Sequence, residues 1–321
     1  MRLVQTLVVR DEVDIVDAQI SYHLNAGVDF VIATDHESRD GTTEILEAYA
    51  RDGLLRRIAV SGEMHDGLWR TDMARLAAIE HGADWVINTD ADEFWMPRHG
   101  RLKDVFAAVP DPYCVVFALS RHFAPRPGDG ALFAERMTAR VSPAVAINDP
   151  TSPYRPHLKA AHRADPDITI SHGAHSASSR RWRALHNWHP CDVLHFPFRS
   201  LEQWENKGIR RARGDSQLGQ YVIALLASER GRSEDRFRTL AVDDATFDRG
   251  RAEGSLVVDV RLRDALRKRS GEREIGTSEV DTDVISESVA ARDADLVRLN
   301  RFLDLLRSRV ADLEIRAGNG R

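Results

Sequence analysis

Short apolar runs alternate with stretches of helical periodicity along the first hundred residues. An apolar run at 3–9 predicts a strand, and the helix after it is marked by apolar residues spaced three or four apart, Val13, Val16, Ile20 and Leu24. The same alternation predicts further strands at 28–34, 57–60 and 85–90, and helices around 45–49 and 71–81. Strands that alternate with helices form a parallel sheet with right-handed crossovers, so the pattern predicts an α/β fold.

The strand predicted at 85–90 runs into three carboxylates, Asp90, Asp92 and Glu93. Residues two apart in an extended chain project to the same face, so Asp90 and Asp92 aim at one point beyond the strand. Two like charges held that close repel unless a cation lies between them, and carboxylate oxygens suit Mg²⁺ or Mn²⁺. The motif therefore predicts a divalent metal site, with a solvated turn as the alternative.

Polar segments also follow the first two predicted strands. Residues 10–12 come directly after the first strand, and Asp35 comes after the second. Ligands of parallel sheets bind beyond the carboxyl ends of the strands. We therefore expect both segments to meet the acidic segment 90–93 at one rim of the sheet.

Composition narrows the class of protein. The chain has 321 residues, of which 42% are hydrophobic and 30% charged, so it can bury one large core or two smaller ones. Its net charge of -5 gives no overall basic field, so nucleic acid is not an expected partner. Cys114 and Cys191 lie far apart without metal-ligand spacing, which indicates a reducing compartment and no disulfide framework.

The sequence lacks the pattern of a signal peptide or a membrane span. The first apolar run contains Gln5 and Thr6 and ends at residues 10–12, which is too short for a signal peptide. No apolar stretch approaches the roughly 20 residues that cross a bilayer. These observations favour a cytoplasmic protein without an integral membrane segment.

Four segments in order carry a resemblance to a known family: 3–12, 23–30, 35–42 and 84–94. They resemble successive motifs of family 2 glycosyltransferases with the GT-A fold, in a branch with an Asp-x-Asp-Glu-Phe signature. The resemblance covers roughly the first 100 residues well and the next 100 weakly. It implies a Rossmann-like, mostly parallel sheet flanked by helices. It also implies transfer of a sugar, with inversion, from a nucleotide-diphosphate sugar such as a UDP-sugar to a carbohydrate or other hydroxyl acceptor.

The resemblance also implies roles for matching positions. Asp35 would contact the nucleotide base or ribose, and Arg10 and Glu12 would line the nucleotide pocket. Asp92 would bind the divalent metal, Mn²⁺ or Mg²⁺, that bridges the diphosphate. Asp90 would hold the ribose or an outer-shell water of the metal.

Further positions extend this implied site. Arg70 falls near a basic contact of the family, with a solvated helix start as its alternative. Histidines crowd the second half, at His157, His162, His172, His175, His186, His189 and His195. For most of them a surface or hydrogen-bonded structural role is expected. His195 opens a segment similar to the family's His-x-x-x-Arg-Ser, which implies a further metal ligand. Lys159 and Arg199 are candidates to pair with diphosphate oxygens, with exposed surface charges as the alternative.

Inversion requires a general base that takes the proton of the acceptor. The sequence offers Glu93, next to the metal motif, and Asp192, close to His195 in the chain. A bound metal would act as a Lewis acid and offset the charge that grows on the leaving diphosphate.

The C-terminal part changes character twice. Residues 201–266 are helical with loops, and their basic cluster 209–213 is expected to be a solvated helix face rather than a phosphate contact. After a polar stretch at 270–282, an apolar seam alternates spacings of three and four, at Leu296, Leu299, Leu303, Leu306, Val310 and Leu313. Such a seam predicts a coiled-coil-like tail that folds back or forms a homodimer through 289–315.

These patterns suggest three regions and leave other functions open. We expect a GT-A domain at 1–200, with a nucleotide-binding half at 1–110 and an acceptor half at 111–200, a helical extension at 201–269, and a linker and amphipathic helix at 270–321. A phosphohydrolase of the haloacid-dehalogenase type also has Asp-x-Asp, but usually on its first strand and followed by threonine. A non-catalytic scaffold assembled through the tail is another alternative. A nucleotidyltransferase would normally show a Gly-rich basic loop near the first strand, which this sequence lacks.

Overall fold

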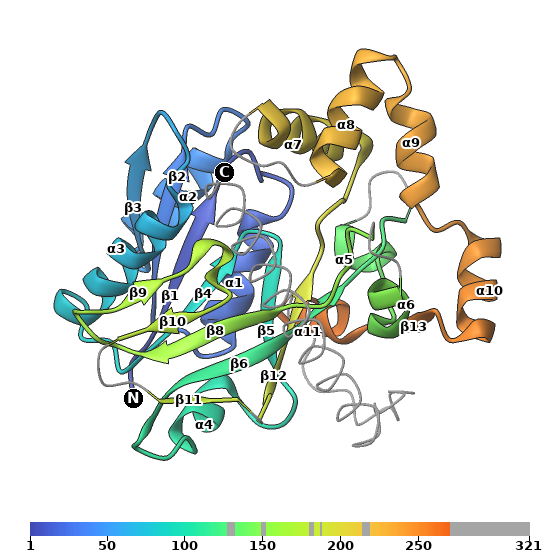
Figure 1. The fold of residues 1–321 in the computed structure, drawn as a ribbon. Coiled ribbons are helices and arrows are strands. Elements are labelled where there is room, and N and C mark those ends of the chain that lie inside the picture. The colour runs from blue at the N-terminus through green and yellow to red at the C-terminus, as the bar shows by residue number, and fades with distance from the viewer. Residues whose placement is uncertain (127–131, 149–151, 180–182, 187, 214–218, 270–321) are drawn as a thin grey trace, which may run out of the picture.

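The first half of the chain forms the alternating strands and helices expected from its pattern. The computed structural model describes residues 1–126, 132–148, 152–179, 183–186, 188–213 and 219–269 (Figure 1). The elements of this half are β1 (Leu3–Val9), α1 (Val16–Asn25), β2 (Phe30–His36), α2 (Thr42–Arg51), β3 (Leu55–Val60), α3 (Asp66–Ile79) and β4 (Trp85–Asp90). Each predicted strand and helix is present, with ends shifted by a few residues.

A nine-stranded sheet forms the centre of the molecule, in the order β3-β2-β1-β4-β8-β6-β12-β5, with β11 paired to β6. Its later strands are β5 (Glu93–Pro97), β6 (Tyr113–His122), β8 (Leu158–Arg163), β11 (Arg183–Leu185) and β12 (Cys191–His195). β3, β2, β1 and β4 are parallel neighbours, as are β6 and β12, whereas β8 and β5 run antiparallel to the strands beside them. The predicted α/β fold with a mostly parallel sheet is confirmed.

The sheet has helices on both faces because its central strands are apolar on both sides. Leu3 and Leu7 of β1 pack with Ile20 of α1 in the largest core cluster, which also includes residues of α2 and α4. Val4, one residue along, points to the opposite face and packs with Met73 of α3. Continuous burial along β1 thus comes from two cores rather than one.

Shorter elements surround the second half of the sheet. They are α4 (Leu102–Ala107), α5 (Phe133–Arg136), β7 (Ala139–Val141), α6 (Pro143–Asn148), β9 (Thr169–Ile170), the 3₁₀ helix η1 (His172–Ala174) and β10 (Ala177–Ser178). The region after the sheet contains α7 (Leu201–Arg213), α8 (Gly219–Glu229), α9 (Ser233–Leu240), α10 (Asp244–Glu253), β13 (Leu256–Val258) and α11 (Arg261–Arg269). Its helices match the expected pattern, and β13 adds a small sheet with β7 that the sequence did not predict.

Two further expectations concern the chain as a whole. Cys114 and Cys191 are both free, as expected. Within the described residues, no helix is long and apolar enough to cross a membrane. The predicted tail at 270–321 lies outside the described residues.

Candidate active site

A cavity of about 660 Å³ lies where the carboxyl ends of β1, β2, β4, β6 and β12 meet. Helices α7 and α8 lie over this end of the sheet (Figure 1). Among the described residues that line the cavity, seven are Arg or Lys and five are Asp or Glu. With neutral histidines its walls therefore carry a net charge of +2, although the whole chain carries -5. Such a surplus attracts an anionic ligand.

The two antiparallel strands add residues to the same rim. A strand that runs against its neighbours begins where they end, so β8 presents Lys159 and β5 presents Glu93 at the carboxyl ends of the parallel strands. The chain reverses between β4 and β5 through Ala91 and Asp92. The predicted acidic motif is therefore the turn that joins the two parts of the sheet.

Asp90 is paired with two cations. Arg70 donates from one amino group to Asp90 Oδ1, and the Lys159 ammonium lies 3.1 Å from Asp90 Oδ2. Arg70 is itself fixed by Asp66, one helical turn earlier on α3, at 2.9 Å. Burial alone would raise the pKa of Asp90, but Arg70 and then Lys159 hold it well below its ordinary value. Arg70 is a buried cavity residue and not a solvated helix start.

Glu93 lies behind the rim with its carboxylate buried. Its Oε1 is 2.7 Å from the Lys159 ammonium, and its Oε2 accepts the backbone N–H of Asp90 at 3.1 Å. Burial raises the pKa of Glu93, an effect that Lys159 opposes and Asp90 reinforces. A carboxyl group whose pKa is raised toward neutrality can take up a proton more readily than a surface one.

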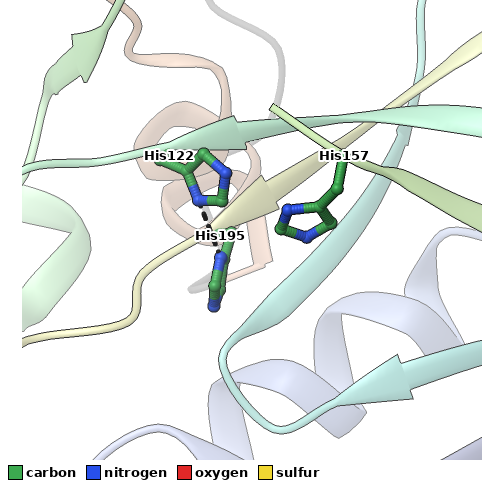
Figure 2. A group of neighbouring side chains, drawn as sticks. All are labelled: His122, His157 and His195. Carbon is green, nitrogen blue, oxygen red and sulfur yellow. Dashed lines mark hydrogen bonds between the residues drawn. The ribbon is translucent and has the colours of Figure 1, made fainter. Parts of the chain in front are cut away.

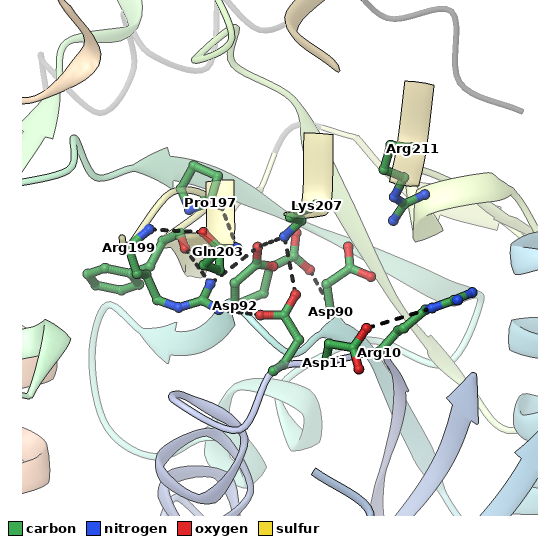
Figure 3. Close-up of polar contacts among 12 residues, drawn as sticks. Arg10, Asp11, Asp90, Asp92, Pro197, Arg199, Gln203, Lys207 and Arg211 are labelled. Carbon is green, nitrogen blue, oxygen red and sulfur yellow. Dashed lines mark hydrogen bonds and ion pairs between the residues drawn. The ribbon is translucent and has the colours of Figure 1, made fainter. Parts of the chain in front are cut away.

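Asp92 faces a cation from the helix above and a histidine from the sheet. The Lys207 ammonium on α7 lies 2.6 Å from Asp92 Oδ2, and His195 Nε2 lies 3.5 Å from the same oxygen. Figure 3 shows Lys207 reaching down to Asp92 beside Asp90. Burial raises the pKa of Asp92, but the Lys207 ammonium opposes that effect, and the pKa lies well below its ordinary value.

Three histidines, His122, His157 and His195, gather at this rim (Figure 2). His122 and His195 are opposite each other on the parallel strands β6 and β12, and their Nδ1 atoms are 2.9 Å apart. His157 precedes β8, and its ring centroid lies 4.9 Å from that of His122. One ring nitrogen from each of the three lies within 4.8 Å of the others. The register of the sheet, which aligns strand ends, is what brings these residues together.

The donor atoms at this rim suit a divalent ion. Carboxylate oxygen and neutral imidazole nitrogen are both ligands of Mn²⁺, and Asp92 Oδ2 and His195 Nε2 face each other across 3.5 Å. Asp90 is less available, because Arg70 and Lys159 already neutralise it. Among the described residues, the group His122, His157 and His195 is a second arrangement that could hold a metal. The residues present therefore fit a metal, with Asp92 and His195 as its nearest ligands.

Helix α7 contributes three cations to the cavity. Lys207, Arg210 and Arg211 are spaced three and four apart, so they share one face of the helix, and all three line the cavity. Arg210 pairs with Asp11 at 2.6 Å, and Arg211 extends toward the cavity near Asp90 (Figure 3). The expectation that the basic cluster 209–213 is a solvated helix face is wrong for Arg210 and Arg211.

Arg10 and Glu12 line the cavity, as expected for the segment after β1. Arg199 does not. Its guanidinium is buried, donates to Glu12 and to Asp14 at 2.7 Å, and lies behind the wall. It cannot face a diphosphate without breaking those ion pairs, so its part is to hold Glu12 in place.

Asp35 also differs from its expected position. Its side chain is 1% exposed and accepts hydrogen bonds from Thr43 at 2.6 Å and from Arg57 at 2.9 Å. It is not among the residues that line the cavity, whereas His36, the last residue of β2, is. The placement does not support a contact from the Asp35 carboxylate to a nucleotide.

Asp192 lies on the opposite side of β12 from the cavity. Its carboxylate is buried among Arg98, Arg121 and Arg261, each about 3 Å away, which hold its pKa well below the ordinary value. Residues three apart on a strand face opposite sides, so proximity to His195 in sequence does not bring Asp192 to the same site. The predicted role as general base is not supported by this position.

Several residues of the cavity escaped the sequence interpretation. Lys207 belongs to the 3–4 spacing with Arg210 and Arg211, a signal that the sequence did contain. His122 and Asp66 carried no local signal. His122 joins the site through the pairing of β6 with β12, and Asp66 joins it through its ion pair with Arg70 on α3. Both contacts arise only when the chain folds.

The sequence matches a family model over part of its length. Residues 4–123 match the model of glycosyltransferase family 92, which covers β1 to β6 and confirms the predicted class of enzyme, a glycosyltransferase. The model is not that of family 2, and the match does not test the acidic motif. Among curated proteins, none matches the sequence.

Two of the solved structures that are similar to the chain were determined with bound UDP. A TarS fragment from S. aureus in complex with UDP is 14% identical, with a TM-score of 0.38, covering 87% of this chain and 95% of that one. Glucosyl-3-phosphoglycerate synthase from Mycobacterium tuberculosis, in complex with Mn²⁺, UDP and phosphoglyceric acid, is 16% identical, with a TM-score of 0.29, covering 51% and 56%.

Proposed function

We propose that the cavity transfers a sugar, with inversion, from a nucleotide-diphosphate sugar to an acceptor hydroxyl. The observation that carries the proposal is the meeting of Asp92, His195 and the α7 cations at the carboxyl ends of the parallel strands. A diphosphate needs cations on its oxygens, and a parallel sheet binds its ligands at this rim. We propose UDP as the nucleotide on the resemblance of the N-terminal segments.

The cations divide into two groups in this proposal. Lys207 and Arg211 project from α7 into the cavity and would contact the diphosphate oxygens directly. Arg70 and Lys159 are buried below them and hold Asp90 and Glu93 in place. Charge-assisted hydrogen bonds from Lys207 and Arg211 would stabilise the charge that develops on the leaving diphosphate.

A divalent metal fits the same site, with Asp92 and His195 as its ligands and Asp90 nearby. When bound, such an ion supplies Lewis-acid stabilisation of the diphosphate. Because Lys207 already contacts Asp92 at 2.6 Å, this ammonium would turn from the carboxylate toward the ligand when the metal binds. Metal dependence and inversion are both parts of the proposal.

Of the two predicted general bases, Glu93 lines the cavity and Asp192 does not. Glu93 is held by Lys159 and by the backbone of Asp90, and burial raises its pKa. We propose Glu93 as the general base that takes the proton of the acceptor hydroxyl.

The loops of residues 111–200 would contact the acceptor substrate. The tail at 289–315 would form a homodimer in the cytoplasm.

The proposal is tested by nucleotide binding. UDP, GDP and TDP are titrated with and without Mn²⁺ while the melting temperature is followed, and UDP with Mn²⁺ is expected to raise it most. Stabilisation by none of these nucleotides, even with metal, contradicts the proposed function.

Substitution of Asp92 locates the metal step. Asp92→Asn keeps the size of the side chain but removes the charge, so the Mn²⁺-dependent part of the UDP affinity is expected to disappear, a loss of about tenfold or more. Isothermal titration calorimetry measures it. Asp104→Asn is the matched control and should bind as the wild type does, because Asp104 is an exposed carboxylate that pairs with Arg101 at the start of α4. An unchanged Mn²⁺ effect in Asp92→Asn would remove Asp92 from the metal site.

A further inference from the structure

The contact between His122 and His195 sets a constraint on where their protons lie. The two Nδ1 atoms are 2.9 Å apart, a hydrogen-bond distance (Figure 2). Two lone pairs at this distance would repel, and so would two N–H groups. One of the two nitrogens therefore donates and the other accepts.

The Nε2 atom of His122 determines which of the two Nδ1 atoms donates and which accepts. His122 Nε2 lies 3.0 Å from the backbone carbonyl oxygen of Arg155, and a carbonyl oxygen can only accept. Nε2 must therefore carry the hydrogen. His122 is 4% exposed, and none of its hydrogen-bond partners in the described part of the chain is a carboxylate. A second proton would create a buried cation that donates to no carboxylate, so His122 is neutral and its Nδ1 is the acceptor.

It follows that His195 Nδ1 carries a hydrogen and donates it to His122. In the neutral ring the lone pair of His195 is then on Nε2, the atom that lies 3.5 Å from Asp92 Oδ2 at the cavity wall. A lone pair and a carboxylate oxygen that face each other are both acceptors, and they attract one another only through a cation between them. This is the arrangement that two ligands of one metal ion require.

We infer that His122 is a positioning residue that fixes His195 in its Nδ1–H tautomer, so that His195 Nε2 is presented to the divalent ion of the donor complex. The hydrogen bonds run from His195 to His122 and from His122 to the Arg155 carbonyl. The last step rests on the proposed metal-dependent function, whereas the tautomer of His195 does not.

His157 provides the contrast. It lies close to both rings, but its Nδ1 is within 3.2 Å of the Arg155 carbonyl, and it has no hydrogen bond to His195 among the described contacts. If the three histidines instead bound a metal together, His157 would matter as much as His122. The inferred role of His122 predicts that it does not.

The first test reads the tautomer directly, without metal, nucleotide or activity. Long-range ¹H–¹⁵N correlation spectra of the metal-free full chain distinguish the two tautomers, and His195→Gln assigns the signal. At alkaline pH, where no imidazolium remains, the wild type is expected to show the Nδ1–H form. His122→Phe, which keeps a ring but removes the acceptor, is expected to shift His195 to the Nε2–H form that can donate to Asp92. His122→Asn is expected to retain the wild-type form, because its amide oxygen lies where Nδ1 was.

If His122→Phe does not fold, the spectrum of the wild type alone still tests the inference. An Nε2–H form of His195 in the wild type overturns it. So does an unchanged tautomer in a folded His122→Phe.

The second test measures Mn²⁺ affinity in the presence of UDP by the electron paramagnetic resonance signal of free Mn²⁺. His122→Phe is expected to weaken binding about 10- to 100-fold, the usual cost of losing the partner of a ligating histidine. His122→Asn and His157→Phe are expected to stay within about threefold of the wild type. An equal loss in His157→Phe would indicate three-histidine coordination and overturn the inference. Failure of the wild type to bind Mn²⁺ would contradict the proposed function, and the spectra would still decide the tautomer.

Discussion

His23 shows how one buried side chain can require a neutral form. Its Nδ1–H donates to the carbonyl of Gln19 at 2.8 Å, and its Nε2 accepts the backbone N–H of Trp95 at 3.0 Å. Only the neutral ring can do both, and this pair of bonds connects α1 to β5. Burial lowers the pKa of His23 from 6.5 to about 4, although the bond to Gln19 opposes the shift.

The free energy of unfolding is therefore expected to decrease as the pH is lowered, because His23 must stay neutral in the folded protein. The unfolded chain takes up a proton near pH 6.5 and the folded protein only near pH 4, so the contribution is complete above pH 6.5 and is lost between pH 6.5 and 4. From pH 7.5 to 5 the loss is about 2 kcal/mol. In urea unfolding, the gap between wild type and His23→Gln should narrow by this amount. A constant gap for His23→Gln would contradict the prediction.

Lys207, unlike the neutral His23, is a charged side chain that we propose binds the ligand. Lys207→Met is expected to weaken UDP binding without metal about 10- to 100-fold, because one charge-assisted hydrogen bond is lost. Calorimetry without Mn²⁺ measures it. Lys103→Met is the matched control, since Lys103 pairs with Asp29 on the outside of the molecule. Equal affinities of wild type and Lys207→Met would exclude a contact from Lys207 to the diphosphate.

The sequence located the acids of the site and the cations Arg70 and Lys159 beside Asp90, but not Lys207 beside Asp92. Asp90, Asp92 and His195 follow apolar strands, and strand ends of a parallel sheet converge whatever the rest of the chain does. Lys207 was missed because the orientation of α7 depends on packing. Asp192 was assigned wrongly because neighbours in sequence on a strand can lie on opposite faces.

At the scale of elements, the packing of α7 against α8 determines how far the cations of α7 that line the cavity lie from the sheet. Gly208, the residue after Lys207, faces Ala224 of α8 so closely that an added Cβ would overlap the Cβ of Ala224. The two helices can therefore approach only because position 208 has no side chain. The strands and helices of the first half were predictable from periodicity, whereas this contact joins two segments whose relation no local pattern encodes.

Gly208→Ala is expected to lower stability by about 1–3 kcal/mol, although alanine is the better helix former, because overpacking separates the helices. It should also weaken UDP binding, since Lys207 moves with α7. Urea unfolding and calorimetry measure the two effects. Gly208→Ala with Ala224→Gly restores the space, so the double variant should recover both. Additive losses in the double variant would show that the contact is not the cause.

At the scale of the whole molecule, the order of the sheet explains what the sequence could not show. The first four strands follow a regular alternation, but β8 and β5 reverse direction and enter between or beside later strands. Their apolar runs are short, so periodicity alone gives neither their direction nor their neighbours. Lys159 and Glu93 reach the site through these reversals.

Dimerisation through the predicted tail is a whole-molecule expectation from sequence. Leu303→Asp places a charge in the apolar seam and is expected to convert a dimer into a monomer, because a charge buried between helices is costly. Light scattering after size exclusion gives the mass. Ser308→Asp, outside the seam, should keep the mass of the wild type. A wild-type monomer, or a dimer that survives Leu303→Asp, would contradict dimerisation through the seam.

The ion pairs of Asp92 with Lys207 and of Asp90 with Arg70 and Lys159 mean that these two carboxylates already have counter-charges before any ligand enters. In the proposed site, a diphosphate that drew Lys207 away would leave Asp92 without its counter-charge, and a metal bound by Asp92 would release Lys207 for the diphosphate. Each ligand thus removes the obstacle to the other. In a closed thermodynamic cycle the two must strengthen each other by the same factor, so the effect of UDP on Mn²⁺ affinity fixes the effect of Mn²⁺ on UDP affinity.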